Sequence, residues 1–138
     1  MITSNRQLSV TKKKVESLQD SLGEFSEEKE KQPFAKASMA QIQSFIKELQ
    51  AEVREYEELQ AKGLDVIELN DLTDIMLIPI KYRIAKNTTQ ENFARKVEVP
   101  LRMIARYESE GYRNITGENF KKILSKLHLK VPGKLTEM

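Results

Sequence analysis

Apolar residues recur at helical spacing near the start of the chain. The positions are Val15, Leu18, Leu22 and Phe25. Thr11 is suited to cap a helix, so this pattern predicts a helix over about residues 12–25. The alternating segment Leu8-Ser9-Val10 before it fits a short strand or an arm. The charged segment from Glu24 to Gln32, closed by Pro33, is predicted to be a connector.

A longer apolar pattern follows with alternating steps of four and three residues. Its members are Ala35, Met39, Ile42, Ile46, Leu49, Val53 and Tyr56. This is the a/d seam of a heptad pattern, and it predicts a helix of about 25 residues that ends near Lys62-Gly63. The first predicted helix is too short to cover the whole seam. We therefore expect a helical hairpin whose uncovered seam residues contact a second copy of the chain or another protein. Those residues are Ile42, Ile46, Leu49 and Val53.

The middle of the chain contains a helix interrupted by proline. Leu64 to Leu69 suits a short strand or an extended linker, and Asn70 or Asp71 can cap a helix that runs to about Lys86. Pro79 lies inside that helix, where it removes a backbone hydrogen bond. We expect a kink at Pro79 or a helix that begins close to it.

Two short helices joined by a tight turn are predicted next. Thr89 can cap a helix over Gln90 to Lys96, and a turn at Glu98-Val99 follows. Pro100 suits the first turn of a second helix that runs to about Glu108. This arrangement is a helix-turn-helix, in which the second helix can enter the major groove of DNA. A last helix is predicted over Gly117 to Leu127, capped by Thr116.

This segment resembles the Xre/Cro family of phage-repressor-like DNA-binding domains, which also includes antitoxins of bacterial toxin-antitoxin pairs. The resemblance covers about residues 70–131. It rests on Thr89-Gln90-Glu91, Phe93-Ala94, Val97, Val99, Ile104 and Arg106-Tyr107-Glu108, with Arg83 at the matching place in the preceding helix. The opening segment from Ile2 to Gln7 and the helical hairpin also look like a subset of antitoxin-like regulators.

The resemblance implies roles for single residues. Gln90 would bind a DNA phosphate and brace the recognition helix, while Leu101, Arg102 and Arg106 would face the bases. Arginine can donate two hydrogen bonds to guanine, whereas leucine can only contact a thymine methyl group. The resemblance also implies a structural ion pair between Arg83 and Glu108.

Two departures from the family pattern affect these implications. Glu98 occupies a turn position that is usually glycine, which predicts strain or a different turn. Leu101 and Met103 replace polar base-reading residues, which lowers the expected sequence specificity but does not affect binding in the groove.

The two halves of the chain differ in net charge. The net charge is +2, with 10 basic and 12 acidic residues in 1–65 and 13 basic and 9 acidic residues in 66–138. The basic residues around the predicted recognition helix are Arg95, Lys96, Arg102, Arg106 and Arg113. An anion-binding surface is therefore expected in the second half, and Lys96 and Arg113 join the predicted DNA-binding residues.

Composition argues against several other classes. The chain has no cysteine and one histidine, and it lacks a glycine-rich phosphate loop and a nucleophile elbow, so we expect no enzyme activity, metal or cofactor. No apolar run approaches the roughly 18 residues of a membrane span, and the N-terminus lacks the apolar core of a signal peptide. A bacterial or phage protein of the cytoplasm and its nucleoid is expected.

The sequence thus predicts an all-α protein with a helical hairpin over 1–68 and a helix-turn-helix domain over 69–138. The predicted function is an autoregulatory, antitoxin-like repressor that binds a palindromic operator in double-stranded DNA as a homodimer. The alternative is an interaction module whose hairpin neutralises a toxin protein while DNA binding is secondary or degenerate.

Overall fold

The computed structural model describes residues 1–24 and 33–138, and within these residues the chain is all-helical, as predicted. The helices are α1 (Asn5–Gly23), α3 (Pro33–Lys62), the 3₁₀ helix η1 (Gly63–Val66), α4 (Leu72–Met76), α5 (Ile78–Ala85), α6 (Gln90–Val97), α7 (Leu101–Ser109) and α8 (Gly117–Lys126). They form two compact units, Met1–Lys62 and Gly63–Met138, which divide between residues 62 and 63 rather than between 68 and 69.

Helix α1 begins earlier than the sequence pattern suggested, so the prediction of Thr11 as its cap and of a strand or arm before it was wrong. The hydroxyl of Ser4 accepts a hydrogen bond from the backbone N–H of Gln7 at 3.2 Å. The Gln7 side chain in turn accepts from the backbone N–H of Thr3 at 2.7 Å. This reciprocal capping stabilises a helix that includes residues 8–10. The predicted helical position Phe25 and the predicted connector over 25–32 lie outside the described residues.

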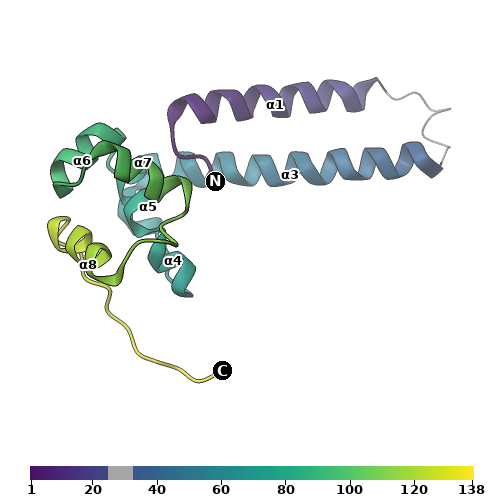
Figure 1. The fold of residues 1–138 in the computed structure, drawn as a ribbon. Helices are drawn as coiled ribbons and strands as arrows, with labels where there is room; N and C mark the ends of the chain where they lie inside the picture. The colour runs from purple at the N-terminus through teal and green to yellow at the C-terminus, as the bar shows by residue number, and fades with distance from the viewer. Residues whose placement is uncertain (25–32) are drawn as a thin grey trace. The chain divides into compact units, whose positions relative to one another are not determined.

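Helices α1 and α3 lie antiparallel and form a hairpin (Figure 1). Helix α3 ends at Lys62 as predicted, and Gly63 follows with φ +72°, a conformation that glycine adopts at little cost. Val15 of α1 and Ile46 of α3 are buried. Within the seam, Ile42, Leu49 and Val53 are half-buried. Helix α1 starts at Asn5, earlier than predicted, so it covers more of the seam than the sequence suggested but leaves these three residues partly exposed.

Polar contacts fix one end of the hairpin. The hydroxyl of Tyr56 donates to the side-chain oxygen of Asn5 at 2.9 Å, and the Gln60 amide donates to the same oxygen at 2.9 Å. Tyr56 is otherwise buried, with 4% of its surface exposed. These bonds join the first turn of α1 to the last turns of α3 and determine which residues of the two helices face each other.

The second unit opens with helices that meet at a proline. Residues 63–66 form the 3₁₀ helix η1, and residues 67–70 have no regular structure, so no strand forms in the 64–69 segment. Asp71 caps α4 and shares a capping box with Asp74. Pro79 lies in the first turn of α5, where its missing N–H has no helical partner to lose. Of the two expected outcomes at Pro79, the structure has the helix that begins close to it, and Leu77 separates that helix from α4.

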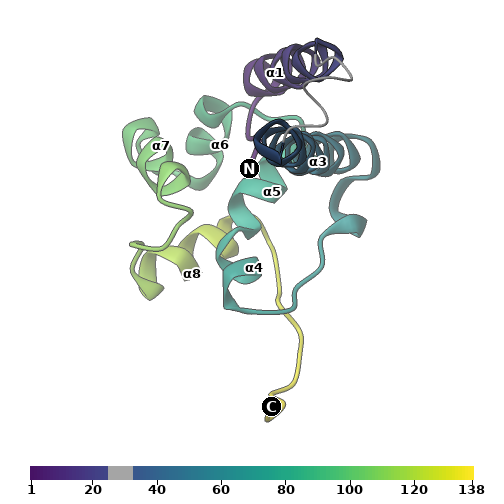
Figure 2. The same ribbon diagram turned by 90° about the vertical axis from the view of Figure 1, so that its right-hand side faces the viewer.

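Helices α5 to α8 surround the core of this unit, and α6 contacts both α7 and α8 (Figure 2). Thr89 caps α6 and Thr116 caps α8, as the sequence predicted. The core side chains that are almost fully enclosed are Ile80, Phe93, Val97, Ile104, Tyr112 and Ile123. Close packing of these side chains therefore holds the helices of the helix-turn-helix in a fixed arrangement.

Tyr112 supplies a test of this core. Its ring packs on those of Tyr107 and Phe120, with centroids 5.6 Å and 6.4 Å away, and its hydroxyl is buried without a hydrogen-bond partner among the described residues. Burial raises the pKa of this hydroxyl above its ordinary value. Tyr112→Phe removes an unsatisfied polar group, so we expect unfolding free energy to stay unchanged or rise by about 1 kcal/mol.

Tyr82→Phe is the matched control for that substitution. The Tyr82 hydroxyl accepts a hydrogen bond from Lys96 at 2.9 Å, so its loss should lower the unfolding free energy by about 0.5–1.5 kcal/mol. Urea denaturation of both variants gives the comparison. A larger loss of stability for Tyr112→Phe than for Tyr82→Phe would contradict the burial of an unsatisfied hydroxyl.

Candidate nucleic-acid interface

A buried ion pair joins α5 to α7. Arg83 donates from Nε to Oε2 of Glu108 at 2.8 Å and from Nη2 to Oε1 at 2.7 Å. The two side chains are 7% and 3% exposed. This bidentate geometry is the strongest arrangement available to an arginine and a carboxylate. The structure therefore brings together the two residues that the family resemblance paired.

Further hydrogen bonds connect this pair to the start of α6. Arg83 donates from Nη1 to the backbone oxygen of Thr88 at 3.1 Å, and the Gln90 side chain donates from Nε2 to Oε1 of Glu108 at 3.1 Å. Gln90 was expected to bind a phosphate and to brace the recognition helix. In the structure its amide nitrogen contacts the end of α7, which is a bracing contact.

The turn between α6 and α7 requires an unusual backbone conformation. Glu98 has φ 57° and ψ 42°, the left-handed region, which costs a non-glycine residue about 1 kcal/mol or more. The backbone N–H of Val99 donates to the oxygen of Ala94 at 3.1 Å and closes the turn. Of the two outcomes that the sequence predicted for Glu98, the structure has the strained one.

An ion pair from α8 holds the same turn. Lys126 Nζ lies 2.7 Å from Oε2 of Glu98. The hydrogen bond and positive charge of Lys126 hold the pKa of the Glu98 carboxyl below its usual range. Both side chains face solvent, so this contact positions the turn more than it stabilises the fold.

Helix α7 has a buried face and an exposed face. Ile104, Tyr107 and Glu108 are buried, whereas Arg102 and Arg106 are exposed. Helical spacing places the two arginines one turn apart on the outer face. Leu101, the third residue expected to face bases, is 45% exposed at the first position of the helix.

The two arginines differ in their surroundings. Arg106 lies over the ring of Tyr107 at 5.8 Å from the centroid and 3.7 Å from the carboxylate of Glu110. Arg102 makes no ion pair or hydrogen bond with any described residue. Its guanidinium is therefore available to a ligand without breaking an internal contact.

The remaining predicted residues flank α7. Lys96, near the end of α6, donates from Nζ to the Tyr82 hydroxyl at 2.9 Å and lies 5.2 Å from the centroid of that ring. Arg113 follows α7 and donates from Nε to the backbone oxygen of Glu110 at 2.9 Å. Both side chains are exposed and carry positive charge beside the turn or end of the recognition helix.

Sequence reasoning missed the residues that orient these cations. Tyr82 holds Lys96, and Glu110 contacts both Arg106 and Arg113. The spacing of four residues from Arg106 to Glu110 is a recognisable signal for a helical ion pair. No short-range signal exists for the contact between Tyr82 and Lys96, which lie on different helices.

Comparison with known protein families identifies the second unit. Residues 80–132, from α5 through α8, match the family model described as helix-turn-helix. These residues are an Xre-type helix-turn-helix domain. The match begins at residue 80, later than the resemblance suggested, and ends at residue 132. No curated protein and no solved structure matches the chain.

The Xre family consists of DNA-binding regulators, and the chain is accordingly a DNA-binding regulator. Within residues 1–24 and 33–138, no cluster of three or more potential metal ligands occurs. None of the helices described in that part of the chain is long and apolar enough to cross a membrane.

The buried pair of the Xre domain gives a prediction on stability. Arg83→Met leaves the Glu108 carboxylate without its buried counter-ion, and Glu108→Gln leaves the Arg83 guanidinium in the same state. Each substitution should lower the unfolding free energy by about 3–5 kcal/mol, as loss of one partner of a buried pair does. Denaturant midpoints measure the effect.

Glu91→Gln is the control, because Glu91 and Arg95 form an exposed pair at 2.7 Å on α6. That substitution should change the unfolding free energy by less than about 1 kcal/mol. If the buried and the exposed variants lose similar small amounts, the Arg83–Glu108 pair does not hold the domain together.

Proposed function

We propose that the protein is a sequence-specific transcriptional repressor that binds a palindromic operator as a homodimer and acts on its own promoter. The observation that carries this proposal is the outer face of α7, where Arg102 and Arg106 are exposed one turn apart on a helix of the Xre domain. A recognition helix reads DNA through side chains at such positions.

Arg102 is the residue best suited to read a base. A guanidinium donates two parallel hydrogen bonds to O6 and N7 of guanine, which contributes about 1–3 kcal/mol of discrimination against other bases. The absence of any internal contact to Arg102 among the described residues means that no ion pair is lost on binding. Arg106 lies against Tyr107 and Glu110, and it would exchange the weak 3.7 Å contact to Glu110 for a base or phosphate.

Lys96 and Arg113 would bind phosphates on either side of the recognition helix. Lys96 donates one hydrogen bond to Tyr82 and Arg113 donates one to the backbone of Glu110, so each side chain has further N–H groups that can donate to a phosphate. Gln90 would support the same surface indirectly through Glu108, with its amide also near the start of α6, where backbone N–H groups attract phosphate.

Leu101 sets a limit on specificity in this proposal. Its exposed side chain can pack on a thymine methyl group but cannot donate a hydrogen bond. Recognition of the DNA base sequence would therefore depend mainly on Arg102 and Arg106. A single helix of this kind contacts few base pairs, so useful affinity requires two copies on two half-sites.

The hairpin supports a second function, the binding of another protein, as in an antitoxin that neutralises a toxin. The specific observation is that α1 and α3 form a compact unit of their own with Ile46 and Val53 beside an open strip between the helices. Since α1 covers much of the seam formed by Ile42, Ile46, Leu49 and Val53, this strip is the part of it that a partner can reach.

Substitution of Arg102 tests the DNA-binding proposal. Arg102→Ala should weaken binding to the cognate operator by about 1–3 kcal/mol and relax the preference at one base pair. Arg102→Lys keeps the charge but loses the bidentate geometry, so it should lose the same preference while it retains nonspecific affinity. Mobility-shift titrations on DNA from the chain's own upstream region and on scrambled DNA give both quantities.

Lys13→Ala is the matched control, because Lys13 is an exposed cation on α1 outside the Xre domain. It should leave the base preference unchanged. Equal behaviour of Arg102→Ala and Lys13→Ala on cognate and scrambled DNA would show that Arg102 does not read a base.

A further inference from the structure

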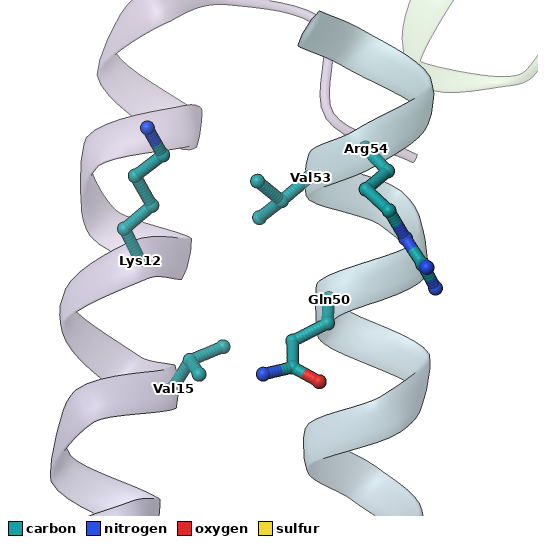
Figure 3. Close-up of a pocket in the computed structure, with 5 residues that line it drawn as sticks. All are labelled: Lys12, Val15, Gln50, Val53 and Arg54. Atoms are coloured by element: carbon teal, nitrogen blue, oxygen red, sulfur yellow. The ribbon is translucent and has the colours of Figure 1, made fainter. Parts of the chain in front are cut away.

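A groove runs along one face of the hairpin between α1 and α3. It consists of two openings of about 370 Å³ and 460 Å³, both lined by Gln50. The lining residues are Lys12, Val15, Gln19 and Leu22 from α1 and Gln43, Ile46, Lys47, Gln50, Val53 and Arg54 from α3. Figure 3 shows Val15 from one helix and Val53 and Gln50 from the other in the space between them. The floor is therefore apolar, with glutamine amides beside it.

The charges along this groove have one sign. Lys12, Lys47 and Arg54 lie at its edges, and none of the described residues that line it is acidic. This is unexpected on a hairpin whose residues 1–62 carry 10 basic and 11 acidic side chains. Lys12 forms an ion pair with Glu57 at 2.7 Å, and both side chains are about half exposed. Lys47 and Arg54 form no ion pair with a described residue.

An apolar floor with cationic edges is complementary to an amphipathic helix that carries acidic residues beside its apolar stripe. The face of α3 from Gln43 to Arg54 spans about 17 Å at 1.5 Å per residue, which matches about three turns of a docked helix. The neutral amides of Gln19, Gln43 and Gln50 can bond to polar groups of the occupant without a charge preference.

A second copy of the chain fits this groove poorly. A two-fold interface places the same surface on both partners, so the cationic edges of one groove, with Lys47 and Arg54, would lie against those of the other. A head-to-tail contact between the groove and an acidic face of α3 would repeat from copy to copy and build a ring or a filament, not a two-fold dimer. The charge pattern therefore favours a different protein as the occupant.

We propose that the groove between α1 and α3 is the docking site for an acidic amphipathic helix of another protein. The half-buried side chains of Leu22 and Val53 contact its apolar stripe above the buried Val15 and Ile46, and Lys47 and Arg54 pair with its carboxylates. This inference rests on the second function proposed for the hairpin and names the chemistry of its partner, and it does not rest on DNA binding, because the groove lies wholly within residues 1–62.

The test uses the full chain and two synthetic peptides. Both are alanine-rich helices of about 18 residues with leucines along one face; one carries glutamates beside the leucines and the other carries lysines at the same positions. Isothermal titration should show the glutamate peptide binding at least about tenfold more tightly than the lysine peptide, with the difference shrinking at high salt. Equal affinities, or no binding of either peptide, would overturn the proposal.

Charge reversal locates the binding site. The double variant Lys47→Glu/Arg54→Glu should lose the preference for the glutamate peptide and favour the lysine peptide instead. The control Lys13→Glu/Lys36→Glu makes the same change in net charge at exposed positions of α1 and α3 that do not line the groove. It should keep the original preference, and circular dichroism should show both variants as helical as the parent chain.

Two further outcomes would also overturn the proposal. One is a loss of preference in the control variant as large as in the groove variant, which would indicate general attraction between charges. The other is a change in the oligomeric state of the chain on Lys47→Glu/Arg54→Glu without peptide, measured by sedimentation. That result would assign the groove to a second copy.

Discussion

The orientation of the recognition helix depends on one buried ion pair. Two charges enclosed in a domain core cost free energy unless each satisfies the other, so Arg83 and Glu108 must stay in contact whenever the domain is folded. This contact joins α5 to the end of α7, and Gln90 adds α6 to the same carboxylate. With Glu108 fixed on the inner side of α7, helical geometry directs Arg102 and Arg106 outward.

Local signals were enough to predict most of the Xre domain. Thr89 and Thr116 each cap the helix that their spacing indicated, and Asp71 does the same for α4. These predictions succeeded because a capping side chain bonds to a backbone group only a few residues away. The start of α1 was predicted too late because the apolar periodicity of this helix begins only at Val15, whereas its cap is formed earlier by Ser4 and Gln7.

Contacts between distant residues could not be predicted in the same way. The single sequence contains no information that would place Lys96 on the ring of Tyr82 or Lys126 on Glu98. Coverage of the hairpin seam depends on the length of α1, and because the start of α1 was predicted too late, the covered part of α3 was predicted too short. The cationic groove likewise arises only when α1 and α3 lie side by side, because neither helix is cationic along its whole length.

The central claim is that α7 of this regulator enters the major groove of an operator with two half-sites. Methylation protection at guanine N7, with the full chain bound to DNA from its own upstream region, tests it most directly because N7 lies in the major groove. The account predicts protected guanines in two clusters about one helical turn, or 34 Å, apart, with one guanine of each cluster exposed again in Arg102→Ala. Binding without N7 protection, or no binding at low salt, would contradict the account.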